Sequence, residues 1–120
     1  MPDIHKRPFD KQKVEEIRTF INANLKNHLN VKLLAQKFGC SESTFRRQFQ
    51  LSFKKNFRGY LLECRMQKAL HLLKEEVTTV NLIACEVGYK SRSSFTHAFS
   101  HRFGYPPISL LDDEVPNERK

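Results

Sequence analysis

The chain has 120 residues and carries 21 lysines and arginines against 13 aspartates and glutamates, a formal net charge of +8 at pH 7. This length suits one small domain, and this charge is typical of proteins that bind a polyanion, usually nucleic acid. No apolar run approaches the roughly 18 residues of a membrane span, so no membrane partner is expected. The sequence shows no secretion signal, and its three cysteines are scattered, so the chain is expected in a reducing cytoplasm. Each cysteine is expected to pack as a small apolar residue.

Helical periodicity runs through most of the chain, and strand-like alternation is hard to find. The sequence therefore predicts an all-α fold of about seven helices. Residues 1–9 are interpreted as a flexible arm and residues 112–120 as an acidic tail. Between them, apolar faces, terminating glycines and the capping residues Asp10, Asn30 and Thr79 predict helices at about residues 11–25, 31–38, 42–51, 57–74, 80–87 and 92–102. A last short turn is opened by Pro106 and Pro107. The expected core residues of the long helix 57–74 are Leu61, Cys64, Ala69, Leu72 and Leu73.

An internal repeat relates two parts of the chain. Residues 30–39, NVKLLAQKFG, align with residues 79–88, TVNLIACEVG, with a capping residue first, an alanine at the same position and a glycine last. Each copy is followed by two phenylalanines spaced four residues apart, and the second copy holds one more residue in its turn. The same local structure is therefore expected twice.

The spacing of alanine, glycine and phenylalanine within each copy is typical of a helix-turn-helix. Two helices that cross over a short turn need a small residue where their backbones approach, and the repeated alanine supplies it. The turn needs a residue that accepts positive φ, and the repeated glycine does so. The phenylalanines anchor the second helix, so its opposite face is held outward, where it suits the major groove of DNA.

The outward faces carry the residue types that base recognition requires. Arginine suits bidentate contact with guanine, and short polar side chains also bind base edges. The anchoring phenylalanines leave two sets of side chains to project outward: Glu42, Ser43, Arg46 and Arg47 in the first copy, and Arg92, Ser93, Thr96 and His97, with Ser94 nearby, in the second.

Basic residues gather in two segments without acids, one between Ser43 and Leu62 and one between Gly88 and Tyr105. This distribution indicates two contact patches. Six side chains that flank the outward helices suit phosphates, which fix register without reading sequence: Lys54, Lys55, Arg58, Lys90, His101 and Arg102.

Other functions have weaker support in the sequence. The arginine pair alone is compatible with a solvated helix face. His97 and His101 have a spacing able to bind zinc, but no acid or cysteine lies nearby, so no metal or cofactor is predicted. No nucleophile–base pair, acidic dyad or phosphate loop is visible, so the chain is not expected to be an enzyme.

With these residues identified, the chain resembles the AraC/XylS family of bacterial transcription regulators over about residues 14–111. The resemblance is carried by VGYKSRSSFTHAFSHRFGYPPISL, residues 87–110, and by RMQKALHLL, residues 65–73. It implies two three-helix helix-turn-helix subdomains, residues 10–56 and 76–111, joined by a linker helix, residues 57–75. By position, it assigns base reading to Ser43, Arg46, Arg47, Arg92, Ser93, Ser94 and His97.

The resemblance implies a sequence-specific regulator that binds double-stranded DNA. Its two recognition helices enter successive major grooves, which repeat about every 34 Å, so a monomer suffices. An activator that also contacts RNA polymerase, in the bacterial nucleoid, is expected. The alternative is a non-specific architectural protein, which needs basic charge but not two anchored recognition helices. Many members carry a small-molecule sensor domain, for which the arm is too short, so the chain is either a stand-alone member or the DNA-binding part of a longer one.

The sequence departs from the family pattern in three places. Lys54 occupies a position where the family has glycine, so the turn after residue 53 is expected to be built differently. Leu110 and Leu111 replace a tyrosine–arginine pair. His97 replaces arginine or glutamine, which makes contact there sensitive to pH in principle.

Overall fold

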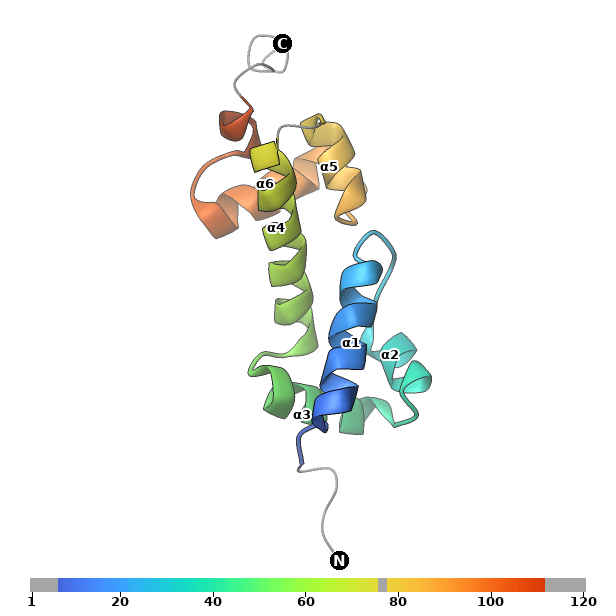
Figure 1. The fold of residues 1–120 in the computed structure, drawn as a ribbon. Helices are drawn as coiled ribbons and strands as arrows, with labels where there is room; N and C mark the ends of the chain where they lie inside the picture. The colour runs from blue at the N-terminus through green and yellow to red at the C-terminus, as the bar shows by residue number, and fades with distance from the viewer. Residues whose placement is uncertain (1–6, 76–77, 112–120) are drawn as a thin grey trace, which may run out of the picture. The chain divides into compact units, whose positions relative to one another are not determined.

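The computed structural model describes residues 7–75 and 78–111, and all regular structure within these residues is helical (Figure 1). The acidic tail and most of the arm lie outside the described residues. The expected all-α fold of about seven helices is confirmed, since the described chain forms six α-helices and one short 3-10 helix: α1 (Lys11–Ala23), α2 (Val31–Lys37), α3 (Glu42–Phe53), α4 (Phe57–Glu75), α5 (Val80–Glu86), α6 (Arg92–Phe103) and η2 (Pro107–Leu110).

The chain divides into two compact units, residues 1–63 and residues 64–120. The boundary between them falls inside α4, so each unit contains part of that helix. Each unit holds one copy of the repeat, α2 and α3 in the first and α5 and α6 in the second. The functional division of the chain into residues 10–56, 57–75 and 76–111 stays a prediction.

Side-chain caps set the points at which the helices begin. The Asp10 carboxylate accepts a hydrogen bond of 2.8 Å from the Lys13 N–H at the start of α1. The Asn30 side chain accepts from the Leu33 N–H at 2.8 Å, and the Thr79 hydroxyl accepts from the Leu82 N–H at 3.3 Å. These caps satisfy N–H groups that have no partner within the helix. Asp10, Asn30 and Thr79 therefore cap the helices that the sequence assigned to them.

The repeated glycines end α2 and α5 in the same way. Gly39 and Gly88 have φ values of +75° and +92°. The residue after each glycine donates its N–H to the carbonyl of the repeated alanine, at 2.9 Å in both copies, and the glycine N–H bonds to the carbonyl one residue further on. This is the Schellman arrangement, in which a left-handed residue lets the chain turn back over the helix end. The second turn is one residue longer than the first, as the alignment predicts, because residues 88–90 precede the Ser91 cap whereas residues 39–40 precede the Ser41 cap.

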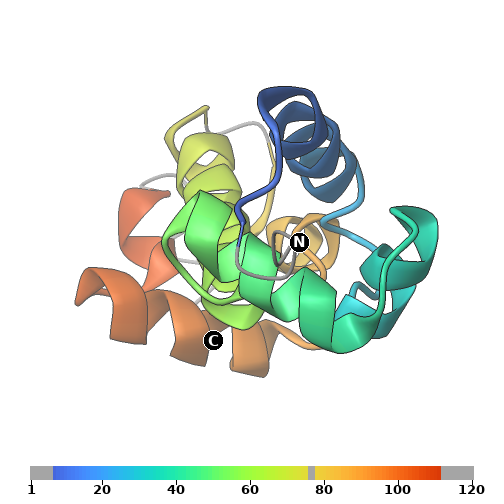
Figure 2. The ribbon, with the colours of Figure 1, turned by 90° about the horizontal axis from the view of Figure 1, so that it is seen from below.

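The core of the first unit is aromatic. Phe45 and Phe49 of α3 are completely buried, and their ring centroids lie 5.7 Å apart. Phe9 lies just before α1 and packs against Phe45, so the N-terminal end of α1 lies beside α3. Figure 2 shows α3 running crosswise to α1. α3 continues two residues beyond the predicted end because Phe53 stacks on Phe49, with 4.1 Å between the ring centroids.

The core of the second unit joins α4, α5, α6 and the residues after η2. Phe95 and Phe99 of α6 are completely buried and pack with Met66, Ala69 and Leu73 of α4, and α6 lies across this part of α4 (Figure 1). Ile83, Ala84 and Val87 complete the cluster from the α5 side, and Leu111 closes it from the C-terminal side.

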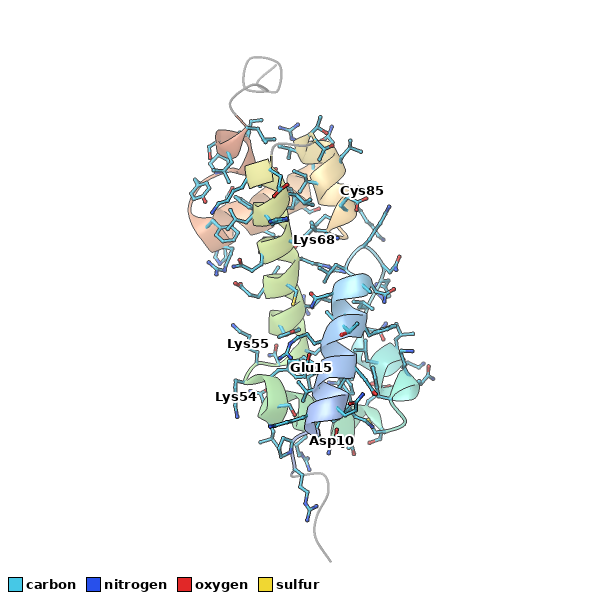
Figure 3. All side chains as sticks on the ribbon, viewed as in Figure 1. Asp10, Glu15, Lys54, Lys55, Lys68 and Cys85 are labelled. Atoms are coloured by element: carbon cyan, nitrogen blue, oxygen red, sulfur yellow. The ribbon has the colours of Figure 1, made fainter. Side chains whose placement is uncertain are left out.

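Three expectations about buried residues need correction. Cys85 is exposed, because it follows Ala84 on α5 and the helix turns its side chain away from the core (Figure 3). Cys64 and Leu72 of α4 are only partly buried, whereas Met66, which was not among the expected core residues, is completely buried. The face of a long helix is harder to assign than its existence, because small rotations change which side chains reach the core.

The turn after α3 is built with lysine in the conformation that glycine adopts elsewhere. Lys54 has φ 65° and ψ 13°, and Gly104, at the same position after α6, has φ 85° and ψ 5°. Lys54 is the only non-glycine residue with positive φ in the described chain. The expectation that this turn is built differently is therefore wrong: the fold keeps the same turn, and the lysine adopts the left-handed conformation.

We expect Lys54→Gly to raise the free energy of unfolding by about 1 kcal/mol, because a side chain in the left-handed region is strained. Denaturant unfolding at neutral pH measures this difference. Lys55→Gly is the matched control, since Lys55 has no positive φ and its replacement adds only chain flexibility. If the Lys54→Gly protein is no more stable than the parent, the left-handed conformation of Lys54 is not strained.

Candidate nucleic-acid interface

The outer face of α3 consists of Glu42, Ser43, Arg46, Arg47 and Gln50, all of them exposed. Each of these positions lies three or four residues from another of the set, so all of them share one side of the helix. The buried phenylalanines of α3 hold the opposite side in the core. The Ser41 hydroxyl fixes the start of the helix, because it accepts the Thr44 N–H at 3.2 Å and donates to the Thr44 hydroxyl at 2.9 Å.

Electrostatics on this face is dominated by arginine. Arg46 forms a long ion pair with Glu42, with 3.9 Å between Nη2 and Oε1, and both side chains are about half exposed or more, at 63% and 48%. A pair of this length in water holds neither group firmly. The guanidinium of Arg46 therefore stays available to an external acceptor.

Three cations continue this surface around the turn between α3 and α4. Lys54, Lys55 and Arg58 are exposed, and Lys54 and Lys55 project away from the ribbon in Figure 3. The Lys54 ammonium donates to the Leu51 carbonyl at 3.1 Å, which holds it at the end of α3. The first unit thus gathers six of the predicted side chains on α3, its C-terminal turn and the first turn of α4.

The outer face of α6 has a different chemistry. Ser93, His97 and His101 are exposed and spaced by four residues, so they form one row along the helix. Ser94 is also exposed, but its hydroxyl lies 2.8 Å from the Ser91 hydroxyl and bonds within the cap. Arg92, at the first position of α6, is only partly exposed.

The predicted phosphate contacts of the second unit flank this row. Lys90 lies exposed in the turn before α6, and Arg102 lies exposed in the last turn. The Arg102 guanidinium sits over the Phe103 ring, 4.7 Å from its centroid, which holds it near the helix end. Of the thirteen side chains predicted from the sequence, twelve are exposed and Arg92 is the exception.

A half-buried tyrosine supports the turn that precedes α6. The Tyr89 ring lies 5.8 Å from the Phe95 ring. Burial raises the pKa of the Tyr89 hydroxyl, and the charge of Arg65 on α4 partly opposes that rise. The same partial burial lowers the pKa of Arg65. Tyr89 is therefore neutral at physiological pH, and its ring packs against the core cluster that α4, α5 and α6 form.

Gln50 belongs to the outer face of α3 but was missed by the sequence analysis. Its distance from Arg46 and Arg47 along the helix was the available signal. In the described part of the chain, no group of three or more histidine, cysteine or acidic side chains is arranged to hold a metal ion. The same residues contain no helix with the length and apolarity to cross a membrane.

We expect Ser91→Ala to lower the free energy of unfolding by about 1 kcal/mol, because it removes the acceptor for an N–H at the start of α6. The bond in question joins the Ser94 N–H to the Ser91 hydroxyl at 3.1 Å. Ser93→Ala, two residues away and without a capping role, is the control and should change stability little. Thermal unfolding followed by circular dichroism compares the two; equal effects would show that the cap is unimportant.

Comparison with known proteins identifies the family to which the chain belongs. A helix-turn-helix domain model matches residues 34–112. YidL of Escherichia coli strain K12, an uncharacterized HTH-type transcriptional regulator, is 30% identical over 115 residues, which cover 94% of this chain and 39% of YidL. The chain thus spans about two fifths of the length of that relative.

Two solved structures share the fold. A transcriptional regulator from Chromobacterium violaceum, described as an AraC-type DNA-binding domain-containing protein, has a TM-score of 0.75 at 22% identity, over 85% of this chain and 91% of that chain. The DNA-binding domain of AdpA, a global transcriptional factor solved with a target DNA, has a TM-score of 0.76 at 20% identity, over 89% of this chain and 96% of that chain. The chain therefore belongs to the AraC/XylS family of helix-turn-helix transcription regulators.

Proposed function

We propose that this chain binds double-stranded DNA sequence-specifically and regulates transcription, with α3 and α6 as its two recognition helices. One observation carries the proposal: in both copies of the repeat, two completely buried phenylalanines and a Schellman turn hold a polar helix face in solvent. Non-specific binding needs only positive charge. An anchored helix face is required when base edges must be met at a fixed depth and angle.

The side chains on these faces suit the two tasks of such a protein. Base reading is assigned to Ser43, Arg46, Arg47, Arg92, Ser93, Ser94 and His97, and phosphate contact to Lys54, Lys55, Arg58, Lys90, His101 and Arg102. Exposure of nearly all of them supports this assignment. The AdpA domain, solved with its target DNA, supports DNA as the partner.

The proposal has finer parts that depend on the family resemblance. The two recognition helices enter successive major grooves of one duplex, about 34 Å apart, so that one monomer covers both. The protein activates transcription from the bacterial nucleoid by contact with RNA polymerase. A promoter–reporter assay, with the DNA site that the protein binds placed at varied distances from the promoter, tests activation. Transcription that falls when the protein is added, at every distance, would contradict activation.

Selection of bound duplexes from a random pool tests the function itself. A specific regulator enriches one sequence pattern and prefers it over random duplex by ~10³ or more at fixed salt. A pattern with two parts spaced by one helical turn supports insertion of both helices. Binding without enrichment indicates the alternative, a non-specific architectural protein.

We expect Arg46→Ala to weaken binding to the selected site by ~1–3 kcal/mol and to relax base preference at one position, because arginine pairs with two acceptors of guanine. Titration of the selected duplex and of single-base variants measures both effects. Arg46→Lys is the matched control: it keeps the charge and loses the fork of donors, so it should also relax the preference. Equal weakening on selected and random duplex would make Arg46 a phosphate contact.

We expect Lys55→Ala to weaken binding on every sequence and to reduce the salt slope of the binding constant by about one, because one fewer counterion is released. Affinities measured over a range of salt concentrations give the slope. Lys74→Ala, which removes an exposed lysine outside the predicted set, should leave the slope unchanged. An unchanged slope for Lys55→Ala would remove Lys55 from the interface.

A further inference from the structure

A single carboxylate stands at the start of the basic surface of the first unit. Glu42 is the first residue of α3 and the only acid of that helix. No other acid occurs before Glu63, whereas five arginines and lysines do: Arg46, Arg47, Lys54, Lys55 and Arg58. A negative charge on a surface that meets phosphates weakens binding to all DNA, so its presence calls for a specific use.

The fold does not explain a carboxylate at this position. A negative charge in the first turn of a helix stabilises it by about 0.3–1 kcal/mol, but α6 begins with Arg92 at the equivalent position and forms a helix of the same length, 12 residues. The Ser41 and Ser91 caps supply the bonds at the two helix starts. Either charge is therefore compatible with the structure.

The geometry leaves the Glu42 carboxylate available to a ligand. Its separation of 3.9 Å from the Arg46 guanidinium exceeds hydrogen-bond distance, and its side chain is 48% exposed. The two groups stand one helical turn apart on the same side of α3. The N-terminal residues of a recognition helix are those that meet base edges, and Glu42 is the first of them.

The chemistry of the major groove offers this carboxylate one partner among the bases. An ionised carboxylate only accepts hydrogen bonds. Guanine presents two acceptors in the groove and thymine one acceptor and a methyl group, whereas cytosine presents only the N4 amino donor. Adenine pairs its amino donor with the N7 acceptor, which suits an amide better than a carboxylate.

Building on the proposed function, we propose that Glu42 is a specificity-determining residue, whose carboxylate accepts a hydrogen bond from the N4 amino group of a cytosine under the first turn of α3. Arg46 reads a guanine at a neighbouring position. Where the cytosine is absent, the carboxylate faces acceptors and phosphates and disfavours binding. Glu42 thus adds discrimination both by attraction to the correct base and by repulsion from others.

Selection from a randomised duplex pool with three proteins tests this proposal. The unmodified chain should enrich a cytosine at one position that Glu42→Ala no longer distinguishes, a loss of about 5- to 150-fold in discrimination. Glu42→Gln, of nearly the same shape, should change that position from cytosine to adenine, because an amide pairs with the adenine N6 and N7. Both variants should bind random-sequence duplex more tightly than the parent, because a repulsive charge is gone.

Glu16→Gln is the matched control, because it removes an exposed carboxylate of α1 and should leave the enriched pattern unchanged. Thermal unfolding of each variant checks that α3 remains intact. An unchanged preference in both Glu42 variants, with the parent still selecting a pattern, would overturn the inference alone. A preference lost only at the guanine assigned to Arg46 would also overturn it, since Glu42 would then act by positioning Arg46. A parent that enriches no pattern would instead overturn the proposed function and, with it, the inference.

Discussion

The hydrogen bond from the residue after the repeated glycine to the repeated alanine carbonyl governs both helix-turn-helix motifs. It joins Cys40 to Ala35 and Tyr89 to Ala84, at 2.9 Å in each case. The bond requires positive φ at the intervening glycine, which costs other residues about 1–2 kcal/mol. Because the alanine is almost completely buried, the two helices approach closely there. The direction of the second helix, and hence its outward face, follows from this turn.

The two copies keep the residues that build the turn and differ in those that face outward. The outer face of α3 combines arginines with one glutamate, whereas that of α6 combines serines with histidines. When the two helix sequences are aligned on their phenylalanines, Glu42 corresponds to Arg92 and Arg47 corresponds to His97. Packing constrains the buried positions because a change of volume there is destabilising. The outward positions carry no such constraint, so the two helices are free to prefer different bases.

Lys54 shows how the surrounding core imposes a backbone conformation on an unsuitable residue. Phe49, Phe53 and Tyr60 pack together across the turn, with 5.4 Å between the Phe49 and Tyr60 ring centroids and 4.8 Å between those of Phe53 and Tyr60. Moving the turn would separate these rings, and aromatic pairs contribute about 0.5–1.5 kcal/mol each beyond their burial. The packing therefore outweighs the strain of one left-handed lysine.

The sequence alone determined the elements, their caps and the repeat, because these depend on neighbours within a few residues: Asp10, Asn30 and Thr79 cap where they were expected, and both glycines adopt positive φ. It also determined that the phenylalanines of α3 and α6 are buried, since their spacing matches one side of a helix. Only the tertiary structure decided that Lys54 adopts the glycine conformation, that Met66 rather than Cys64 faces the core, and that Arg92 is partly covered while the other predicted side chains are exposed. These features depend on packing between segments far apart in the chain, where the fit of particular side chains settles small differences in free energy that no local pattern records.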